Sequence, residues 1–270
     1  MVVQHNLSAM NTNRQMGVVT SALQKSTEKL SSGYKINRAG DDAAGLSISE
    51  KMRSQIRGLN KASDNAQDGI SLIQVAEGAL NETHSILQRM NELATQAAND
   101  TNTSVDRQSI KDEIEQLNEE LDRISTTTQF NKQDLLTGKF SGKLQVGALK
   151  GQTMDVKISL AVSAKGLKVS AVKVSTNANA GAAMQSIQDA IESVSKQRSK
   201  LGAIQNRLEH TINNLDTNAE NTQAAESRIR DTDMADEMVQ YSKNNILSQA
   251  GQSMLTQANQ QTQGVLSLLG

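Results

Sequence analysis

The chain has 270 residues and a net charge of −1, with no Cys, Pro or Trp and only two Tyr and two Phe. The absence of Cys excludes disulfides, Cys-ligated zinc and a thiol nucleophile, and the scarcity of aromatic rings argues against base stacking with single-stranded nucleic acid. Balanced charge gives no basic field for nucleic acid or an anionic membrane, and the apolar content of 36% is low for a compact domain.

The first predicted element is an amphipathic helix at about residues 1–33, without the basic region and apolar run of a secretory signal peptide. No stretch of the chain approaches ~18 apolar residues, so we expect no membrane insertion. The apolar stripe of this helix needs a partner. It includes Val3, Leu7, Met10 and Leu23.

Ser, Gly and Asn interrupt the helical spacing at residues 30–37, and Asp41 and Asp42 can cap a helix that begins near Ala43. From Met52 to Leu87 mostly apolar or small residues recur at alternating steps of four and three, which predicts a long helix over 43–98 with a narrow coiled-coil seam. After a break at 99–102, a second heptad pattern predicts a helix over 104–128 with an acidic outer face.

The middle of the chain changes to a period of two, which is typical of strands. Apolar and polar residues alternate at 144–148, 154–162, 167–169 and 172–174, and we predict two or three short antiparallel strands across 140–175. Residues 141–175 hold six Lys and one Asp, a local charge of +5. Because so few strands are marginal alone, they must pack on the helices.

Helical spacing returns at about 180–225, and a last amphipathic segment covers 234–270. Its apolar residues include Leu247, Met254, Leu255, Val265, Leu266, Leu268 and Leu269. The predicted fold is therefore mainly α. It is a long antiparallel coiled-coil or helical bundle built from both chain ends, with a small β-hairpin element inserted near the middle.

No catalytic or metal site emerges from the sequence. Glu82 and His84 are two residues apart and Glu209 and His210 are adjacent, so neither pair shares a helix face as metal ligands must. Phosphate loops, dinucleotide fingerprints and nucleophile elbows are absent. We expect no enzyme activity, no cofactor and no metal.

Several longer motifs resemble those of bacterial flagellin. They follow in the right order at both ends, and the resemblance that they mark covers about 220 residues. The N-terminal motifs are LSSGYKIN at 30–37, DDAAGL at 41–46, IRGL at 56–59, NAQDGIS at 65–71, EGAL at 77–80 and TQFN at 128–131. The C-terminal motifs are LGAIQNRL at 201–208, AESRIRD at 225–231, AGQSMLTQANQ at 250–260 and VLSLL at 265–269.

The resemblance implies a minimal flagellin, a structural subunit that self-assembles into the filament used for motility. The implied parts are an inner terminal helical domain (1–42 plus 229–270), a helical core domain (43–139 plus 176–228) and a small β element (140–175) in place of variable outer domains. The apolar terminal residues given above would line the inner tube. The implied spoke or linker residues are Leu30, Ser32, Gly33, Ile36, Asn37, Asp41 and Asp42.

The same resemblance implies export of the unfolded chain through the flagellar type III apparatus, without a cleaved signal peptide, to an extracellular location. The implied partners are other copies of the chain, an export chaperone on the C-terminal helix, the filament cap and the hook-junction proteins. Recognition by a host Toll-like receptor is implied by the motif QRMNEL at 88–93. Its implied contact residues are Gln88, Arg89, Leu93 and Glu113.

Three other functions remain open on the sequence alone. A hook–filament junction protein shares similar ends but has a different interior and a weaker match at 30–80. An intracellular coiled-coil scaffold would have no partner outside the cell. An enzyme is disfavoured because no catalytic site was found.

Overall fold

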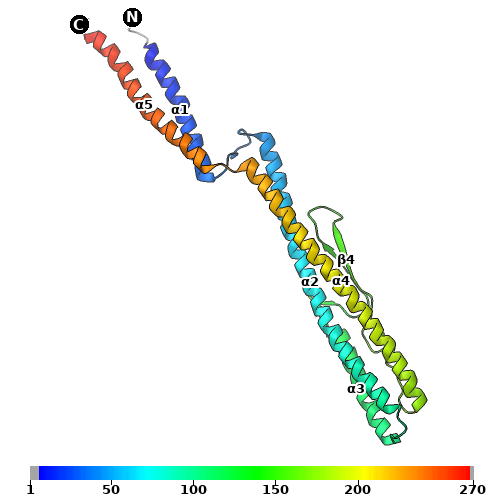
Figure 1. Cartoon of the computed structure of the whole chain (residues 1–270). Helices are drawn as coiled ribbons and strands as arrows, with labels where there is room; N and C mark the ends of the chain where they lie inside the picture. The colour runs from blue at the N-terminus through cyan, green and yellow to red at the C-terminus, as the bar shows by residue number, and fades with distance from the viewer. Residues whose placement is uncertain (1–5, 268–270) are drawn as a thin grey trace. The chain divides into compact units, whose positions relative to one another are not determined.

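The structure is a computed structural model that describes residues 6–267, and side chains as far as Gln261. It confirms a mainly α fold with small antiparallel strand pairs in the middle (Figure 1). The helices are α1 (Leu7–Ser32), α2 (Ala43–Ala97), α3 (Ser104–Thr127), α4 (Asn177–Arg230) and α5 (Met234–Ser267). The strands are β1 (Gln129–Phe130), β2 (Gln133–Asp134), β3 (Phe140–Gln145) and β4 (Thr153–Ile158).

The residues divide into two compact units. The terminal unit contains the residues up to Ser54 together with those from Asn221 onward, and the central unit contains Gln55–Glu220. The sequence analysis divides the chain into three parts according to their expected place in an assembly. That division stays a prediction. Within the described residues, no helix is long and apolar enough to cross a bilayer.

In the terminal unit, α1 and α5 lie side by side (Figure 1). The Asn6 side chain caps α1 by accepting a hydrogen bond from the Ala9 N–H at 3.0 Å, and its amide donates to the Ala258 carbonyl of α5 at 2.9 Å. Helix α1 ends at Gly33, whose φ of +76° favours glycine and whose N–H donates to the Lys29 carbonyl. One residue therefore caps α1 and joins it to the far end of the chain.

The core of the central unit lies between α2, α3, α4 and the strands. Leu80, Leu87 and Met90 of α2 and Leu201 and Leu208 of α4 are fully buried in one cluster. Helix α3 adds the residues of its heptad, Ile110, Ile114, Leu121 and Ile124. This arrangement confirms the apolar seam predicted for α2 and the heptad predicted for α3.

Helix α3 begins at a reciprocal cap. The Thr103 hydroxyl accepts from the Asp106 N–H, and the Asp106 carboxylate accepts from the Thr103 N–H at 2.8 Å. Hydrogen bonds from the Thr103 hydroxyl and then from its N–H stabilise the carboxylate and lower the pKa of Asp106. This cap explains why the break at 99–102 ends where the sequence predicted.

Strands β3 and β4 form an antiparallel hairpin in which Phe140 pairs with Ile158 and Gln145 with Thr153. Met154, Val156 and Ile158 alternate toward the core, as the period of two predicted. The alternation at 167–174 forms no strand. Lys168 has a φ of +62°, and the Leu167 and Val169 amides donate within the local turns, to the carbonyls of Ser163 and Ala164.

Candidate functional site

The terminal unit is almost without a core of its own. Among its described residues, Ile36 and Ala258 are the buried apolar side chains. Isolated helices depend on an amphipathic face packed against other elements for their stability. Helices α1 and α5 therefore need further surfaces to cover their apolar side chains.

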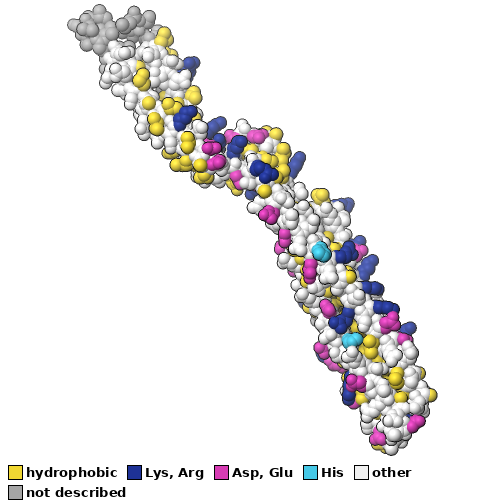
Figure 2. Space-filling model, in the orientation of Figure 1, with side chains coloured by type: hydrophobic (Ala, Val, Ile, Leu, Met, Phe, Trp, Pro, Cys, Tyr) yellow, Lys and Arg dark blue, Asp and Glu magenta, His cyan; other side chains and the backbone are white. Residues whose placement is uncertain are grey.

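Those side chains lie in solvent on both helices, and Figure 2 shows apolar side chains along this part of the surface. Leu7 is 72% exposed and Met10 is 64% exposed on α1, and Met254 is 62% exposed on α5. Leu247 is also exposed, whereas Leu23 and Leu255 are half-buried. Large exposed apolar surfaces of this kind mark interaction sites.

Two further exposed apolar residues of α5, Val239 and Ile246, were missed by the sequence reasoning. They are seven residues apart and so share one helix face, which is the signal that identifies them. Val3, Leu268 and Leu269 lie outside the described residues, and the side chains of Val265 and Leu266 lie outside the described part of the chain as well.

The linker residues come together where α1 ends and α2 begins. Ile36 is 3% exposed, Leu30 is half-buried, and the Ser32 hydroxyl donates to the Lys29 carbonyl and accepts from the Tyr34 N–H. The Asp42 carboxylate accepts from the Gly45 N–H at 2.9 Å, as an N-terminal cap of α2 does.

Asp41 instead caps the turn that precedes α2. Its carboxylate accepts from the N–H groups of Arg38 at 3.1 Å and Asn37 at 3.3 Å. The hydrogen bond from the Arg38 N–H is the main cause that lowers the pKa of Asp41.

The two breaks between helices are joined to each other. The Lys35 N–H donates to the Arg230 carbonyl at 2.6 Å, and the Thr232 N–H donates to the Gly33 carbonyl at 3.0 Å. The Arg230 guanidinium lies 4.7 Å from the centre of the Tyr34 ring and pairs with Glu50 at 2.8 Å. The ends of α1 and α4 and the start of α5 are therefore held together.

The structure brings Arg89 and Glu113 together across α2 and α3, with 2.9 Å between the guanidinium and the carboxylate. Arg89 also donates to Glu92 at 3.2 Å, and Gln88 is exposed beside His84. Leu93, however, is only 2% exposed because it packs in the core, so it is not part of this surface. The apolar contact expected at Leu93 is therefore absent from the free subunit.

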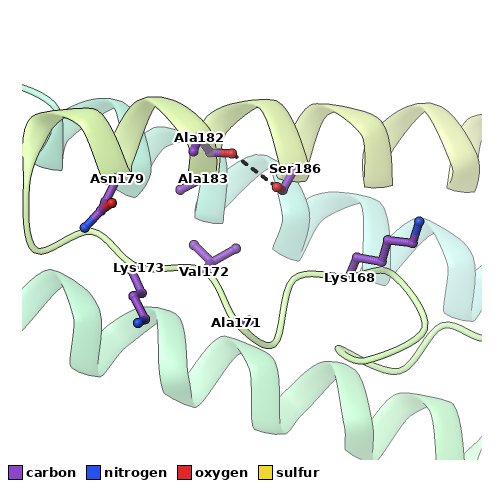
Figure 3. Close-up of a pocket in the computed structure, with 8 residues that line it drawn as sticks. All are labelled: Lys168, Ala171, Val172, Lys173, Asn179, Ala182, Ala183 and Ser186. Carbon is purple, nitrogen blue, oxygen red and sulfur yellow. Dashed lines mark hydrogen bonds between the residues drawn. The ribbon is translucent and has the colours of Figure 1, made fainter.

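A hollow of about 240 Å³ lies between the first turns of α4 and the loop that holds Lys168 and Lys173 (Figure 3). The Ser186 hydroxyl in it donates to the Ala182 carbonyl at 3.1 Å, and neither a carboxylate nor a histidine lines it. Ser186 therefore has neither a histidine nor a carboxylate in this hollow to act as its general base. Within residues 6–267, no group of three or more His, Asp or Glu is placed to hold a metal ion.

Comparison with known proteins supplies the context for these surfaces. The family model for the bacterial flagellin N-terminal helical region matches residues 3–141, and that for the bacterial flagellin C-terminal helical region matches residues 184–269. The chain is 56% identical to a flagellin of Halalkalibacterium halodurans and 51% identical to a flagellin of Bacillus subtilis, in each case over all of both chains.

Among solved structures, the crystal structure of Bacillus cereus flagellin matches 60% of this chain and 94% of its own length, at 33% identity and a TM-score of 0.51. A putative flagellar hook-associated protein from Vibrio parahaemolyticus matches 71% of this chain and 100% of its own length, at 15% identity and a TM-score of 0.62. The second likeness is one of fold alone. The two family models and the full-length relatives therefore decide between the filament subunit and the junction protein that the sequence left open.

Proposed function

The chain belongs to the bacterial flagellin family as a member of minimal type, a structural subunit of the flagellar filament and not an enzyme, and from this premise we propose that α1 and α5 form the inner wall of that filament. The observation that supports this role is the nearly coreless terminal unit, which buries only Ile36 and Ala258 among its described apolar residues. Other copies of the chain supply the surfaces that cover the apolar residues of this unit. The filament places the protein outside the cell as part of an appendage.

Contacts between unlike surfaces of successive copies do not close into a ring, so they build an open helical polymer. Leu7, Met10, Leu247 and Met254 are then the apolar residues that each copy buries against its neighbours. Val3, Val265, Leu266, Leu268 and Leu269 continue the same stripe in the sequence. In this proposal the linker of residues 30–42 joins the inner wall to the helical core outside it.

Ile246→Asp is expected to block or strongly weaken assembly, because it places a charge on an exposed apolar position of α5. The concentration needed for polymerisation should rise by about tenfold or more, which corresponds to ~1.4 kcal/mol. Sedimentation and electron microscopy of concentrated protein measure this effect.

Gln240→Asp is the matched control, since it adds the same charge at an exposed polar position of the same helix. Circular dichroism of both variants should give the helix content of the unaltered chain. An Ile246→Asp protein that assembles as well as the control removes the inner-wall role of α5.

We further propose that the chain is exported unfolded by the flagellar type III apparatus, with an export chaperone holding the C-terminal helix. The absence of Cys and Pro supports this route, because it removes disulfide traps and slow prolyl isomerisation from a chain that folds after transit. The exposed apolar residues of α5 support the chaperone, which would cover them before assembly. The filament cap and hook-junction proteins are the proposed partners at the two ends of the polymer.

Recognition by a host Toll-like receptor is also proposed, now centred on Gln88, Arg89 and Glu113. The exposed Arg89 presents a guanidinium to a partner, while Glu113 and Glu92 hold it in place. Leu93 contributes indirectly to this surface, because it packs in the core and holds α2 in position.

Arg89→Ala is expected to lower affinity for the receptor ectodomain by about tenfold or more, as the loss of a charged interface anchor does. Surface plasmon resonance on monomeric protein measures it. Lys111→Ala, which removes another exposed ion pair of α3 (Lys111–Glu115, 3.2 Å), is the control and should bind normally. Equal affinity of the Arg89 variant and the control would remove this surface from the receptor proposal.

A further inference from the structure

The positive charge of the chain is concentrated in its middle. Residues 141–175 carry +5, and since the whole chain carries −1, the remaining residues carry −6. Figure 2 shows Lys and Arg side chains along the edge of the central unit where the hairpin lies. All six cations of this segment are lysines, whose compact charge binds anions without a fixed geometry, whereas Arg suits planar groups. Such a segment favours a partner with many anions over a single small ligand.

Three of these lysines, Lys165, Lys168 and Lys173, lie in the loop between β4 and α4. In the hairpin, Lys157 pairs with Asp155 at 3.9 Å, so part of the charge there is compensated. The three lysines of the loop have no carboxylate partner among the described side chains. Their charge is therefore available to a partner.

The loop holds its lysines in fixed positions. Leu167 and Val169, on either side of Lys168, are buried in the core of the central unit. The Ala164 N–H donates to the Asp122 carboxylate of α3 at 2.8 Å, which ties the loop to that helix. These contacts keep Lys168 at a φ of +62°, which is uncommon for a residue other than glycine. An ordered loop loses little conformational entropy when a partner binds.

Two hollows lie between this loop and α4, and Lys168 and Ser186 line both of them. Their volumes are about 240 and 170 Å³. Together they form a groove along α4 from Asn179 to Ser193, which is about 20 Å at ~1.5 Å per residue and is called the α4 groove below. Figure 3 shows Lys173 and Lys168 at the two ends of the larger hollow. The α4 groove is long enough for a short stretch of a linear polymer.

The lining of the α4 groove changes from one end to the other. The larger hollow has Lys168 and Lys173 and no carboxylate, and the smaller hollow adds Asp189. The hydroxyls of Ser186 and Ser193 donate to carbonyls one turn earlier in α4, so their oxygens remain as acceptors. Cations beside hydroxyl and carboxylate acceptors match a partner that has both anions and hydroxyl donors.

An acidic polysaccharide has this combination, because its sugar rings bear hydroxyls and some of them bear a carboxylate. Asp189 accepts from the Gln185 amide at 2.9 Å through one oxygen, and its other oxygen can accept from a sugar hydroxyl. Val172 and Ala183 supply apolar surface for the C–H groups of a ring. Nucleic acid fits less well, because no aromatic ring for base stacking is among the described residues that line the groove and Asp189 repels phosphate.

We propose that the α4 groove binds a linear acidic polysaccharide, with carboxylates at Lys168 and Lys173 and hydroxyls at Asp189. The site of one copy is weak, because each exposed charge pair contributes little. Strong binding rests on the proposed inner wall: assembly through α1 and α5 leaves the central units outside, where one polysaccharide chain can engage the grooves of many copies. The filament then adheres to surfaces that carry such a polymer.

Biolayer interferometry on immobilised alginate, a polymer of uronic acids, tests this binding with filaments and with monomers. Filaments should bind at least about a hundredfold more tightly than monomers, and neither should bind neutral dextran. Lys168→Gln with Lys173→Gln should lower the affinity of filaments about tenfold or more, since every copy loses the contact. Lys51→Gln with Lys61→Gln, which removes two exposed lysines of α2, is the matched control and should bind normally.

Asp189→Ala separates a polysaccharide site from a surface that only attracts anions. It should weaken alginate binding about threefold or more, because hydrogen bonds to sugar hydroxyls are lost. It should strengthen the binding of duplex DNA, because a repulsive charge is lost. Circular dichroism should give the helix content of the unaltered chain for every variant.

Three results would overturn the proposal. The first is tighter alginate binding by Asp189→Ala, the second is equal affinity of the groove variant and the α2 control, and the third is equal binding of dextran and alginate. Duplex DNA bound more tightly than alginate by the unaltered filament would also overturn it, by assigning the groove to nucleic acid. If the unaltered chain forms no filaments, the proposed inner wall fails, and the same variants compared as monomers still decide the groove.

Discussion

Removal of residues 234–270 is expected to abolish filament formation, with no polymer at concentrations where the full chain assembles. The deletion takes away α5 and leaves α1, whose only buried residue is Ser26, without its neighbour. A helix of 26 residues with an exposed apolar stripe is marginal in water when nothing packs on it. Binding of the proposed export chaperone should be lost in the same variant.

Electron microscopy and sedimentation measure the loss of polymer, and hydrogen exchange locates its cause. Amides of α1 should exchange faster in the truncated chain, while amides beside Leu80 and Leu201 in the central core should keep their protection. Filaments from the truncated chain, or an α1 that stays protected without α5, would show that the terminal helices do not depend on each other.

Leu93→Ala is expected to lower the free energy of unfolding by about 2–5 kcal/mol, the range for truncating a buried leucine. Leu93 is 2% exposed and lies in the cluster that joins α2, α3 and α4. Arg89→Ala, one turn earlier on α2, changes an exposed side chain and should leave the unfolding midpoint nearly unchanged. Urea denaturation followed by circular dichroism compares the two variants.

Leu93→Met serves as the volume-conserving control and should cost less than ~1.5 kcal/mol. The comparison separates two ways in which the motif at 88–93 can affect the proposed receptor binding. If receptor affinity falls equally in Leu93→Ala and Leu93→Met, Leu93 contacts the receptor directly. If receptor affinity falls in step with the unfolding midpoint, the cause is a weakened fold. A Leu93→Ala protein as stable as the unaltered chain would contradict the buried position.

The long helices were predictable because their apolar residues repeat regularly and because specific residues cap them. Thr103 and Asp106 fix the start of α3 where the sequence placed it. The end of α4 was predicted near residue 225, but the helix continues to Arg230. The polar stretch at 218–226 has no apolar period to identify it, and the carbonyl of Arg230 is held by the Lys35 N–H, more than 190 residues earlier in the chain.

Two features of the central unit were not predictable from local patterns. The two-residue strands β1 and β2 are too short to alternate, and their turn has positive φ at Asn131 and Lys132 without a glycine to indicate it. Leu93 lies off the predicted seam of α2 and is buried because more than one element packs on that helix. Exposure of a residue on a long helix depends on how many neighbours the helix has, which a single period does not reveal.

The cap at Asn6 has a consequence for the order in which the chain folds. Its amide donates to Ala258, which is 252 residues away in the sequence, so this contact closes nearly the whole chain into one loop. Contacts of such separation form late, because loop-closure entropy opposes them until other structure has shortened the connection. The central unit can collapse on its own core first. The paired termini are therefore the last part to acquire structure. Until the residues of α5 are available to fold, α1 has no neighbour to pack against.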